Sequence, residues 1–597
     1  MCEGLSIEEI FEGYSTFQRC NQAPEIKHSK EHTVLFELPL SEDVDVLPIP
    51  RLNESEENES NFEEYVKLPF DKSSIYYEID QNGEKIQKSR WDLIKDSLKN
   101  RKIENSKELE EAIKSYNTKF AKEWNFSALH KFFDEELLEE QQEQFFDELM
   151  PKIIDLALQL PDLIRSIPFL RQKRNQCISM SKKQAASILA NAFLCTFPNR
   201  NVARKSTDYP EINFSRLFGS KSAHVVQKIK CIFNYFRRVI LKMPTGVLTF
   251  QRRYIKDFPQ WSTSDLKFSS IKWHSDSKGT IENAAGMLQV DFANRYLGGG
   301  VLGHGCVQEE IRFAVCPELI VGMLFFESMK PDETILITGA EIFNKHSGYS
   351  NTFKWEGNYI DNTPCDKFRR KQIYIVAMDA VSFHKPKMQF EEFLLRRETN
   401  KAYCGFYHDP NDIEKPIPVA TGNWGCGAFR GAKNLKCLLQ FIACVSNNRN
   451  LVYFTFGDEA LMKSMAEMFS FLQQKDASIS QLWKCLVTFK NDMKCFEDLY
   501  KYIYDNFDII NNNSPPETIN ECQSFNEIQS KKSDEDDYEN PSKRSKISDD
   551  SSETSSIADL CANLNEKISA PENNENQICE QSSSNQPTIL EYFKSNS

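Results

Sequence analysis

The sequence lacks long hydrophobic runs and closely spaced cysteines. Its longest uninterrupted apolar stretch is LIVGMLFF, from Leu319, far shorter than the roughly 20 residues of a membrane-spanning helix. No basic segment followed by an apolar run opens the chain, so no secretory signal is expected. The 17 cysteines are scattered and form no C-x-x-C pair. This pattern favours reduced thiols over a disulfide framework.

Sequence motifs of metal enzymes and of P-loop proteins are missing as well. There is no H-E-x-x-H motif and no Cys/His quartet, so we expect chemistry that needs no metal ion and no other cofactor. No G-x-x-x-x-G-K-[ST] motif is present, which argues against a P-loop nucleotide site. Because these motifs are absent, the function has to be predicted from other motifs in the sequence.

Negative charge is concentrated at the two ends of the chain. Residues 1–64 and 511–597 have net charges of −12 and −10, which leaves +8 for residues 65–510 out of the total of −14. A basic folded body suits a polyanionic ligand. Acidic solvated tails around a modestly basic body are the plain alternative, and the composition leaves both interpretations open.

The pattern along the chain predicts four regions. Residues 1–70 are acidic without periodicity, which predicts a disordered N-terminal segment. Residues 71–245 repeat apolar positions at spacings of three and four, which predicts an all-helical accessory domain. Residues 246–510 alternate short β-rich runs with amphipathic stretches, which predicts an α/β fold with a sheet flanked by helices. Residues 511–597 are rich in Ser, Asn and acid, and we expect a disordered tail.

A glycine-rich loop lies between a predicted strand at 287–292 and a predicted helix that starts near Val307. Its sequence, YLGGGVLGHGCVQEEIRF, runs from Tyr296 to Phe313. Glycines let a backbone approach a phosphate closely, and a helix N-terminus offers free N–H groups to an anion. A merely flexible loop is the simpler interpretation of the glycines.

Two adjacent carboxylates, Glu309 and Glu310, follow the loop. Neighbours on a helix point about 100° apart, so the two cannot do the same work. Acidic residues in the first turn of a helix are favourable by themselves. A carboxylate beside an anion site needs a stronger reason, and general acid catalysis at a glycosidic oxygen, with a later role as base for water, supplies one.

These residues carry a family resemblance. The stretch VDFANRYLGGGVLGHGCVQEEIRF resembles the signature of the poly(ADP-ribose) glycohydrolases. GAEIFNKHSGYSNTFKW, GNWGCGAF and LVYFTFGD resemble further blocks of that family in the same order, and the resemblance covers roughly residues 90–505. It implies a macrodomain-like mixed sheet preceded by a helical domain. It also implies hydrolysis of the ribose–ribose O-glycosidic bonds of poly(ADP-ribose), which releases ADP-ribose.

The resemblance implies a role for each matching residue. Glu310 corresponds to the catalytic acid and base, Glu309 to the carboxylate that orients ribose hydroxyls, and Asp291 to a third acid of the site. The implied substrate-binding residues are Glu282 (adenine), Asn294 (ribose), Gly298, Gly299 and Gly300 (diphosphate), Gln308, Tyr349, Asn423, Phe429 and Phe456 (terminal ribose). His304, in the same loop, has no assigned role.

Single residues of this set also have structural explanations. An aromatic residue in apolar surroundings, such as Tyr349 or Phe456, is typical of a core. Asp291 is suited to a strand end, and Asn423 beside Gly422 to a turn. The joint occurrence in family order, rather than any one residue, favours the functional interpretation.

The predicted tail contains two short motifs. Basic pairs ten residues apart resemble a bipartite nuclear localisation signal, formed by Lys531, Lys532, Lys543, Arg544 and Lys546. QPTILEYF resembles the motif that docks onto the sliding clamp of DNA replication (PCNA), through Gln586, Ile589, Tyr592 and Phe593. One helical turn would place the apolar residues on one face as a plug. Chance basic pairs and leftover hydrophobic residues are the alternatives.

The sequence is therefore compatible with three functions. The first is an active poly(ADP-ribose) glycohydrolase of the DNA damage and replication response, nuclear with a cytoplasmic share left open. Its expected partners are poly(ADP-ribose) on modified proteins, the sliding clamp and nuclear import receptors, with no membrane and no sequence-specific DNA binding. The second is a non-catalytic poly(ADP-ribose)-binding adaptor, which gives no reason for Glu309 and Glu310. The third is a Rossmann-type enzyme that uses NAD, against which the aromatic blocks argue.

Overall fold

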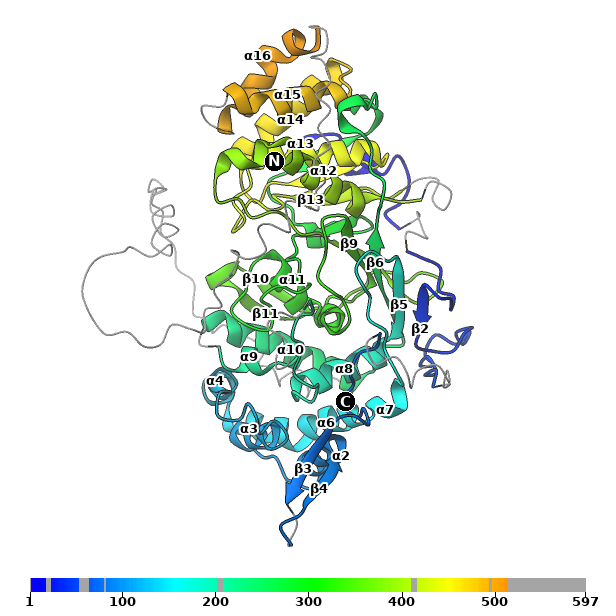
Figure 1. The fold of residues 1–597 in the computed structure, drawn as a ribbon, viewed down its shortest axis with the longest axis vertical. Helices are drawn as coiled ribbons and strands as arrows, with labels where there is room; N and C mark the ends of the chain where they lie inside the picture. Colours follow the sequence, from blue (N-terminus) through cyan, green and yellow to red (C-terminus); the bar gives the residue numbers. More distant parts are fainter. Residues whose placement is uncertain are drawn as a thin grey trace, which may run out of the picture. The chain divides into compact units, whose positions relative to one another are not determined.

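A ten-stranded mixed sheet forms the centre of residues 1–512 (Figure 1). This computed structural model describes residues 2–17, 23–52, 64–79, 82–200, 208–220, 222–409, 416–492 and 496–512. The strands of the sheet, in spatial order, are β1 (Cys2–Gly4), β7 (Trp273–Asp276), β14 (Leu451–Phe454), β13 (Val419–Gly422), β8 (Leu288–Asp291), β12 (Lys371–Ala377), β9 (Glu333–Gly339), β6 (Val247–Tyr254), β5 (Gln176–Ser181) and β2 (His32–Val34).

The middle of the sheet is parallel and its flanks are mainly antiparallel. Strands β7, β14, β13, β8 and β12 run in one direction, while β9, β6 and β5 alternate beyond them. Two hairpins lie outside the sheet: β3 (Ile75–Ile79) with β4 (Lys85–Ser89), and β10 (Asn344–Ser347) with β11 (Lys354–Asn358). The predicted α/β architecture is confirmed.

Helices cover both faces of the sheet. The helices before β6 are α1 (Ile7–Ile10), α2 (Arg90–Lys99), α3 (Ser106–Ser115), α4 (Ser127–Glu136), α5 (Glu139–Gln144), η2 (Phe145–Leu149), α6 (Met150–Leu158), α7 (Leu160–Leu163), α8 (Lys182–Phe193), α9 (Ser215–Phe218) and α10 (Ala223–Leu241). The later ones are η4 (Trp261–Thr263), η5 (Phe268–Ser270), η6 (Ile281–Asn283), α11 (Gln308–Val315), η7 (Pro317–Leu324), η8 (Ser350–Thr352), η9 (Pro386–Phe390), α12 (Glu392–Phe406), α13 (Lys433–Ser446), α14 (Glu459–Gln474), α15 (Ile479–Asp492), η10 (Phe496–Asp498) and α16 (Leu499–Asn512). Figure 1 shows α12 to α16 gathered at one end and α2, α3 and α6 at the opposite end.

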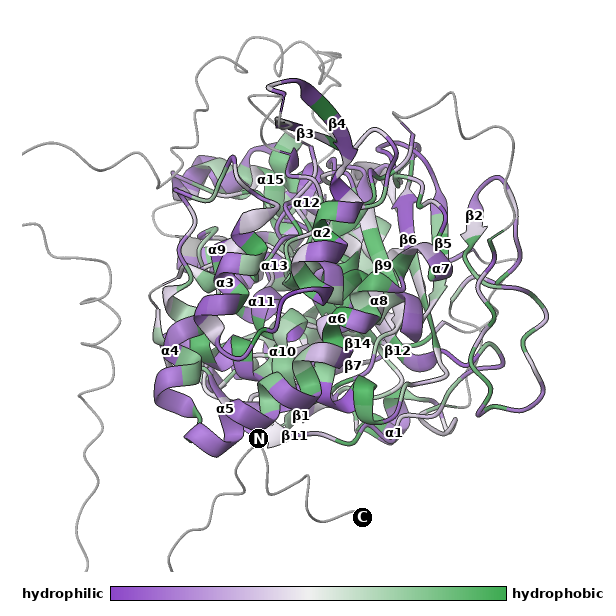
Figure 2. Ribbon diagram, turned by 90° about the horizontal axis from the view of Figure 1, so that it is seen from below, coloured by the Kyte–Doolittle hydropathy of each residue, from purple (hydrophilic) through white to green (hydrophobic). Residues whose placement is uncertain are grey.

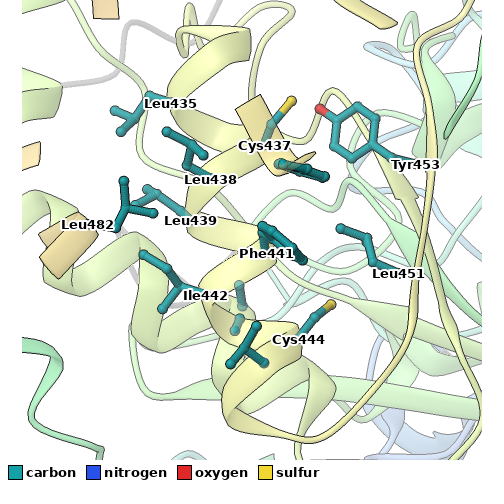
Figure 3. Packing of buried hydrophobic residues seen from close by; sticks show 14 of the residues in the cluster. Leu435, Cys437, Leu438, Leu439, Phe441, Ile442, Cys444, Leu451, Tyr453 and Leu482 are labelled. Carbon is teal, nitrogen blue, oxygen red and sulfur yellow. The ribbon is translucent and has the colours of Figure 1, made fainter. Parts of the chain in front are cut away.

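A large hydrophobic core lies between the sheet and helices α12 to α16. Figure 3 shows side chains of α13 reaching β14 on one side, through Phe441 toward Leu451 and Tyr453, and Leu482 of α15 on the other. Fully burying one such side chain stabilises the fold by about 1.5–3 kcal/mol. Figure 2 shows the same partition for the whole fold, with hydrophobic residues on interior elements and hydrophilic ones on the outer turns of α4 and α5.

Helix α10 joins the helical layer to the rest of the fold. It is 19 residues long, and its apolar side chains recur at spacings of three and four. Residues on several sides of the helix are buried, because α10 packs against α4 and α6 on one side and against α11 and β11 on the other. This central position brings Lys228 of α10 beside the glycine loop.

The N-terminal segment differs from the prediction. Residues 1–70 were expected to be disordered, yet β1 pairs with β7 and β2 pairs with β5 in the main sheet. Phe11 and Phe36 are 3% and 1% exposed, so apolar residues spread among the acidic ones are enough to hold the described parts of this segment to the body. The prediction of disorder is wrong for these parts.

The predicted all-helical domain also contains strands. The β3–β4 hairpin lies within residues 71–245, and β5 supplies a strand to the main sheet. The sequence of β5, QCISMS, is half polar, yet its last four residues are buried in the strand that lies between β2 and β6. Helices nevertheless make up most of the described residues in this region.

The sequence also led to predictions about disulfides, membrane-spanning helices and the C-terminal tail. None of its cysteines forms a disulfide. None of its helices combines the length and the apolar character needed to cross a membrane. The tail predicted over residues 511–597, with both of its motifs, lies almost wholly outside the described residues.

Candidate active site

The glycine loop lies at the edge of the sheet where the parallel strands end. Strand β8 ends at Asp291, and α11 begins at Gln308 after the loop. Strands β12, β13 and β14 run in the same direction as β8, so the residues that follow them lie at the same edge. This edge is where ligands bind in open α/β sheets.

Glu310 connects the start of α11 to the glycine loop. Its Oε1 accepts a hydrogen bond from Gly300 N at 2.8 Å, and its Oε2 accepts one from Val307 N at 2.9 Å. The side chain is 7% exposed. Two backbone donors therefore fix the carboxylate in one orientation at the mouth of the loop, which is the preorganisation that a catalytic acid needs.

Glu309 is held by different backbone groups. Its Oε1 accepts from Gly298 N at 2.7 Å and its Oε2 from Asn294 N at 2.8 Å. Burial raises the pKa of this carboxyl well above its usual range, and the charges of Asp291 and Glu310 raise it further. The two adjacent glutamates thus have separate backbone partners, as their different directions on the helix require.

Asp291 is the third acid of this cluster. It is 1% exposed, and neither of its carboxyl oxygens has a hydrogen-bond partner among the described residues. Burial raises its pKa well above the ordinary value of 3.8, and Glu310 adds to the rise while Arg312 opposes it. A buried carboxyl without donors favours its neutral form.

Replacing Asp291 by Asn is expected to stabilise the protein at pH 8 more than at pH 4. Folding raises the pKa of Asp291. As the pH rises from 3.8 toward the folded pKa, the carboxyl ionises in the unfolded state but not yet in the folded state, so the free energy of unfolding falls. An asparagine side chain does not titrate, so this fall is absent from the variant. Thermal unfolding of both proteins across this pH range measures the difference.

Asp366→Asn is a matched control with the opposite sign. Its carboxylate pairs with Arg370 Nε at 2.7 Å, so its loss should destabilise the protein at pH 8. If Asp291→Asn behaved like Asp366→Asn, the raised pKa of Asp291 would be contradicted.

The glycines of the loop make room for the carboxylates themselves. Gly299 has a φ of +50°, and a Cβ there would lie 2.6 Å from an oxygen of Glu309 and 2.6 Å from one of Glu310. A Cβ at Gly305 would lie 2.6 Å from Glu310 Oε1. These positions therefore need glycine even without a ligand, a reason that the sequence did not reveal.

Gln308 and Asn294 shape the two ends of the loop. Gln308 Oε1 accepts from Phe292 N at 2.8 Å, and its Nε2 donates to Val290 O at 3.2 Å. Asn294 Oδ1 accepts from Tyr296 N at 3.0 Å, which forms the turn that leads into the glycines. In this structure both predicted substrate contacts serve the loop, while the backbone of Asn294 also holds Glu309.

Lys228 was not found by sequence reasoning. Its Nζ donates to the carbonyls of Val301, Gly303 and Gly305 at 2.9, 2.7 and 2.7 Å, and the residue is 1% exposed. Burial lowers its pKa to about 8. One buried ammonium on α10 therefore binds the outer half of the glycine loop through all three of its protons.

His304 connects the loop to the helical layer. Its Nδ1 lies 2.9 Å from Ser220 Oγ and 3.1 Å from Ser222 Oγ, and its carbonyl lies 2.8 Å from His224 Nε2. These partners lie just before α10 and in its first turn. The structure thus gives His304 a role as an anchor of the loop, together with Lys228.

Two exposed aromatic side chains accompany the carboxylates. Tyr349 and Phe456 are 54% and 45% exposed, which excludes the alternative that they are core residues. Although much of Tyr349 is exposed, its hydroxyl is partly buried, and this burial raises the pKa of the hydroxyl; a hydrogen bond to the backbone of Gln308 lowers the pKa, and the charge of Glu310 raises it. Phe456 has a φ of +54° and stands edge-on to Phe292, with ring centroids 6.4 Å apart.

The remaining predicted residues lie around this edge with different surroundings. Glu282, in η6, is close enough to raise the pKa of Asp291 and of Tyr349. Asn423 Oδ1 accepts from the hydroxyl of Tyr453 at 3.2 Å just after β13. Phe429 is half-buried and packs against the main core. The structure therefore brings Glu282 to the acids and gives Phe429 mainly a packing role.

Two family models match consecutive parts of the chain. Residues 137–252 match the model described as Poly (ADP-ribose) glycohydrolase (PARG), helical domain. Residues 258–463 match the model described as Poly (ADP-ribose) glycohydrolase (PARG), Macro domain fold. The second range contains the glycine loop, both glutamates and the aromatic residues described above.

Named relatives agree with these models. The chain is 33% identical over 446 residues to Poly(ADP-ribose) glycohydrolase 1 of Arabidopsis thaliana, an alignment that covers 60% of this chain and 80% of the relative. It is 34% identical over 340 residues to Poly(ADP-ribose) glycohydrolase 1 of Caenorhabditis elegans, covering 55% of this chain and 42% of the relative.

Proposed function

The chain belongs to the poly(ADP-ribose) glycohydrolase family, and from this premise we propose that it cleaves the ribose–ribose bonds of poly(ADP-ribose) with Glu310 as general acid and base. The activity class is that of the family, a hydrolase acting on poly(ADP-ribose). The assignment to Glu310 depends on one observation: the two backbone N–H groups that fix its carboxylate at the mouth of the glycine loop.

The proposed reaction has two proton transfers at one carboxyl group. Glu310 first donates a proton to the departing ribose oxygen, and the bond to the anomeric carbon breaks as an oxocarbenium-like centre forms. The resulting carboxylate then takes a proton from the water that attacks this centre. Because its two hydrogen-bond donors belong to the backbone, the carboxyl group of Glu310 keeps its position through both proton transfers.

Glu309 and Asp291 are proposed to hold the ribose rather than to transfer protons. Glu309 is more deeply buried than Glu310 and is already fixed by two backbone donors. Burial raises the pKa of both acids in the folded protein. Neutral carboxyl groups can donate and accept hydrogen bonds, which suits ribose hydroxyls and avoids repelling the diphosphate.

The exposed aromatic residues are proposed to cover the ligand. Tyr349 lies beside the start of α11, and Phe456 stands across from Phe292 near the end of β8. Flat side chains on two sides of the acids suit the bases and sugars of ADP-ribose. Backbone N–H groups of the glycine loop that Glu309 and Glu310 do not occupy would bind the diphosphate.

The test is incubation of the full chain with purified poly(ADP-ribose) in the presence of a metal chelator. We expect free ADP-ribose as the product, identified by chromatography, with the chelator present. The alternative, an adaptor that only binds the polymer, predicts tight binding with no release. A rate abolished by the chelator and restored by a metal would contradict the expected metal-independent chemistry.

The tail supports a proposal about where the enzyme acts. We place it in the nucleus, imported through Lys531, Lys532, Lys543, Arg544 and Lys546 and recruited to replicating or damaged DNA by the sliding clamp. The proposal depends on sequence alone, because these residues lie outside the described part of the structure.

A peptide of residues 583–597 is expected to bind the purified sliding clamp, and the Tyr592→Ala, Phe593→Ala peptide to bind at least about 30-fold more weakly. Removing an aromatic anchor from a docking motif typically costs about 2 kcal/mol or more. Fluorescence polarisation measures both affinities, with Lys594→Ala as the control that should bind like the wild type. Equal binding by the double variant would refute the docking motif.

A further inference from the structure

A cysteine, a histidine and an aspartate meet at the edge of the sheet formed by β1 and β7. Cys2 stands opposite Asp276 in the antiparallel register, and Gly4 stands opposite His274. Residues two apart on a strand share one face, so His274 and Asp276 point to the same side as their cross-strand neighbour Cys2. One ligand atom from each of the three side chains lies within 4.8 Å of the other two.

His274 is fixed in the tautomer that a metal ligand needs. Its Nδ1 lies 2.7 Å from the carbonyl of Leu5, which can only accept, so Nδ1 carries the proton. The ring is 7% exposed. Its Nε2 is therefore left with a lone pair, and a backbone carbonyl on the other nitrogen is the usual partner that orients a metal-binding histidine.

Asp276 is oriented in a comparable way. Its Oδ1 accepts from Lys278 N at 2.8 Å, and its Oδ2 accepts from Gly279 N at 3.0 Å. Each oxygen keeps a further lone pair. Cys2 is exposed, which gives an ion a path to the group.

We propose that Cys2, His274 and Asp276 bind a divalent cation of the zinc type, with water as the fourth ligand. Sulfur, imidazole and carboxylate are the three ligand types that zinc accepts. In a tetrahedral zinc site neighbouring ligand atoms are about 3.5 Å apart, as follows from metal–ligand distances of about 2.0–2.3 Å. The three side chains need to close by only about one ångström to reach that geometry, and the exposed Cys2 can supply most of this movement.

The position of the group gives the cation a structural rather than a chemical role. The carbonyl of Asp276 accepts from Thr455 N at 3.0 Å, and the carbonyl of Ser277 accepts from Gly457 N at 2.7 Å. These bonds hold the residues on both sides of Phe456. A cation at Asp276 would thus fasten the N-terminal strand to the sheet and steady the segment that carries Phe456.

The test uses the full chain with its own N-terminus, purified free of metal. Adding Zn²⁺ is expected to raise the melting temperature, and Co²⁺ to produce the near-ultraviolet charge-transfer band of a thiolate ligand. Cys2→Ala should lose the band and bind Zn²⁺ at least tenfold more weakly, as measured by competition with a chromogenic chelator. Cys365→Ala is the matched control, because Cys365 is also exposed but lies outside this group.

Two results would overturn the proposal. One is a wild-type protein whose melting temperature does not respond to Zn²⁺ and that shows no thiolate band with Co²⁺. The other is equal loss, or equal retention, of the band in Cys2→Ala and Cys365→Ala. Cys2 is exposed and replaced by a smaller residue, so the variant keeps its fold. Neither readout depends on hydrolysis of poly(ADP-ribose), so failure here leaves the proposed function untouched.

Discussion

Glu310→Gln is expected to lower kcat for release of ADP-ribose from poly(ADP-ribose) by about 10³-fold or more, while the Kd for ADP-ribose changes by less than about threefold. General acid–base catalysis contributes up to about 10⁴-fold in rate, and in the proposed mechanism one carboxyl performs both proton transfers. Glutamine has the shape of glutamate but has no proton to give and no charge with which to activate water.

The same substitution has a small structural cost that must be measured. Both oxygens of Glu310 accept backbone N–H groups, from Gly300 and Val307. The amide of glutamine can accept only one of these, and its NH₂ group must face the other donor. A lost hydrogen bond of this kind costs about 1–3 kcal/mol, so thermal unfolding of the variant should show a folded but slightly less stable protein.

Glu309→Gln is the matched control, because Glu309 also accepts two backbone N–H groups. Its amide also leaves one backbone donor without an acceptor, but the neutral amide removes the cost of burying a carboxyl whose pKa is raised, so the loss of stability should be smaller. Its kinetic effect should differ: if Glu309 orients ribose, KM and the Kd for ADP-ribose rise, whereas kcat falls much less than in Glu310→Gln. A Glu310→Gln protein that releases ADP-ribose at nearly the wild-type rate would show that another group is the acid.

The sequence was sufficient for those parts of the fold whose signal is local. Strands β9, β12 and β14 consist mainly of apolar and β-branched residues, and α13 and α14 show helical periodicity over whole turns. Strands β7 and β13, with the sequences WHSD and VATG, are short and partly polar. Only their neighbours in the sheet make them strands, and neighbours far apart in sequence leave no local pattern.

The candidate site shows the same limit at the level of residues. The loop and both glutamates could be found because they are consecutive. The spacing of the glycines alone points to a different kind of site, because Gly298, Gly300 and Gly303 also match the G-x-G-x-x-G spacing of dinucleotide-binding loops. The carboxylates that lie against the glycines distinguish this loop from a dinucleotide-binding loop. Cys2 and His274 are far apart in the chain and meet only through the pairing of β1 with β7.

Lys228 is the residue of the site that sequence reasoning was least able to find. A lysine on an amphipathic helix such as α10 ordinarily points to solvent. Here it is 1% exposed, and its three protons meet the carbonyls of Val301, Gly303 and Gly305. The other side of the same loop carries Gly300 N and Val307 N, which hold Glu310. Lys228 therefore holds, through the loop, the carboxylate that is proposed as the general acid and base.

Lys228→Met is expected to lower kcat/KM by about 100-fold, since misplacing a catalytic group by about one ångström has an effect of this size. Methionine fills similar space but donates no hydrogen bond, so three buried carbonyls lose their donor. Each lost partner costs about 1–3 kcal/mol, and unfolding by denaturant should show a loss of several kcal/mol. Lys230→Met, which removes a lysine two residues away that pairs with Glu136, is the control and should keep its activity.

The pH profile separates a positioning role from simple support of the fold. Burial lowers the pKa of Lys228 to about 8, so above that pH the amine has two protons for three carbonyls. Activity of the wild type should therefore decline as the pH rises through 8. Stability should not decline with it, because a lysine whose pKa is lowered on folding favours the folded state more as the pH rises from 8 to 10.5. Lys228→Met should lack the alkaline decline; an identical decline in the variant would assign it to another group.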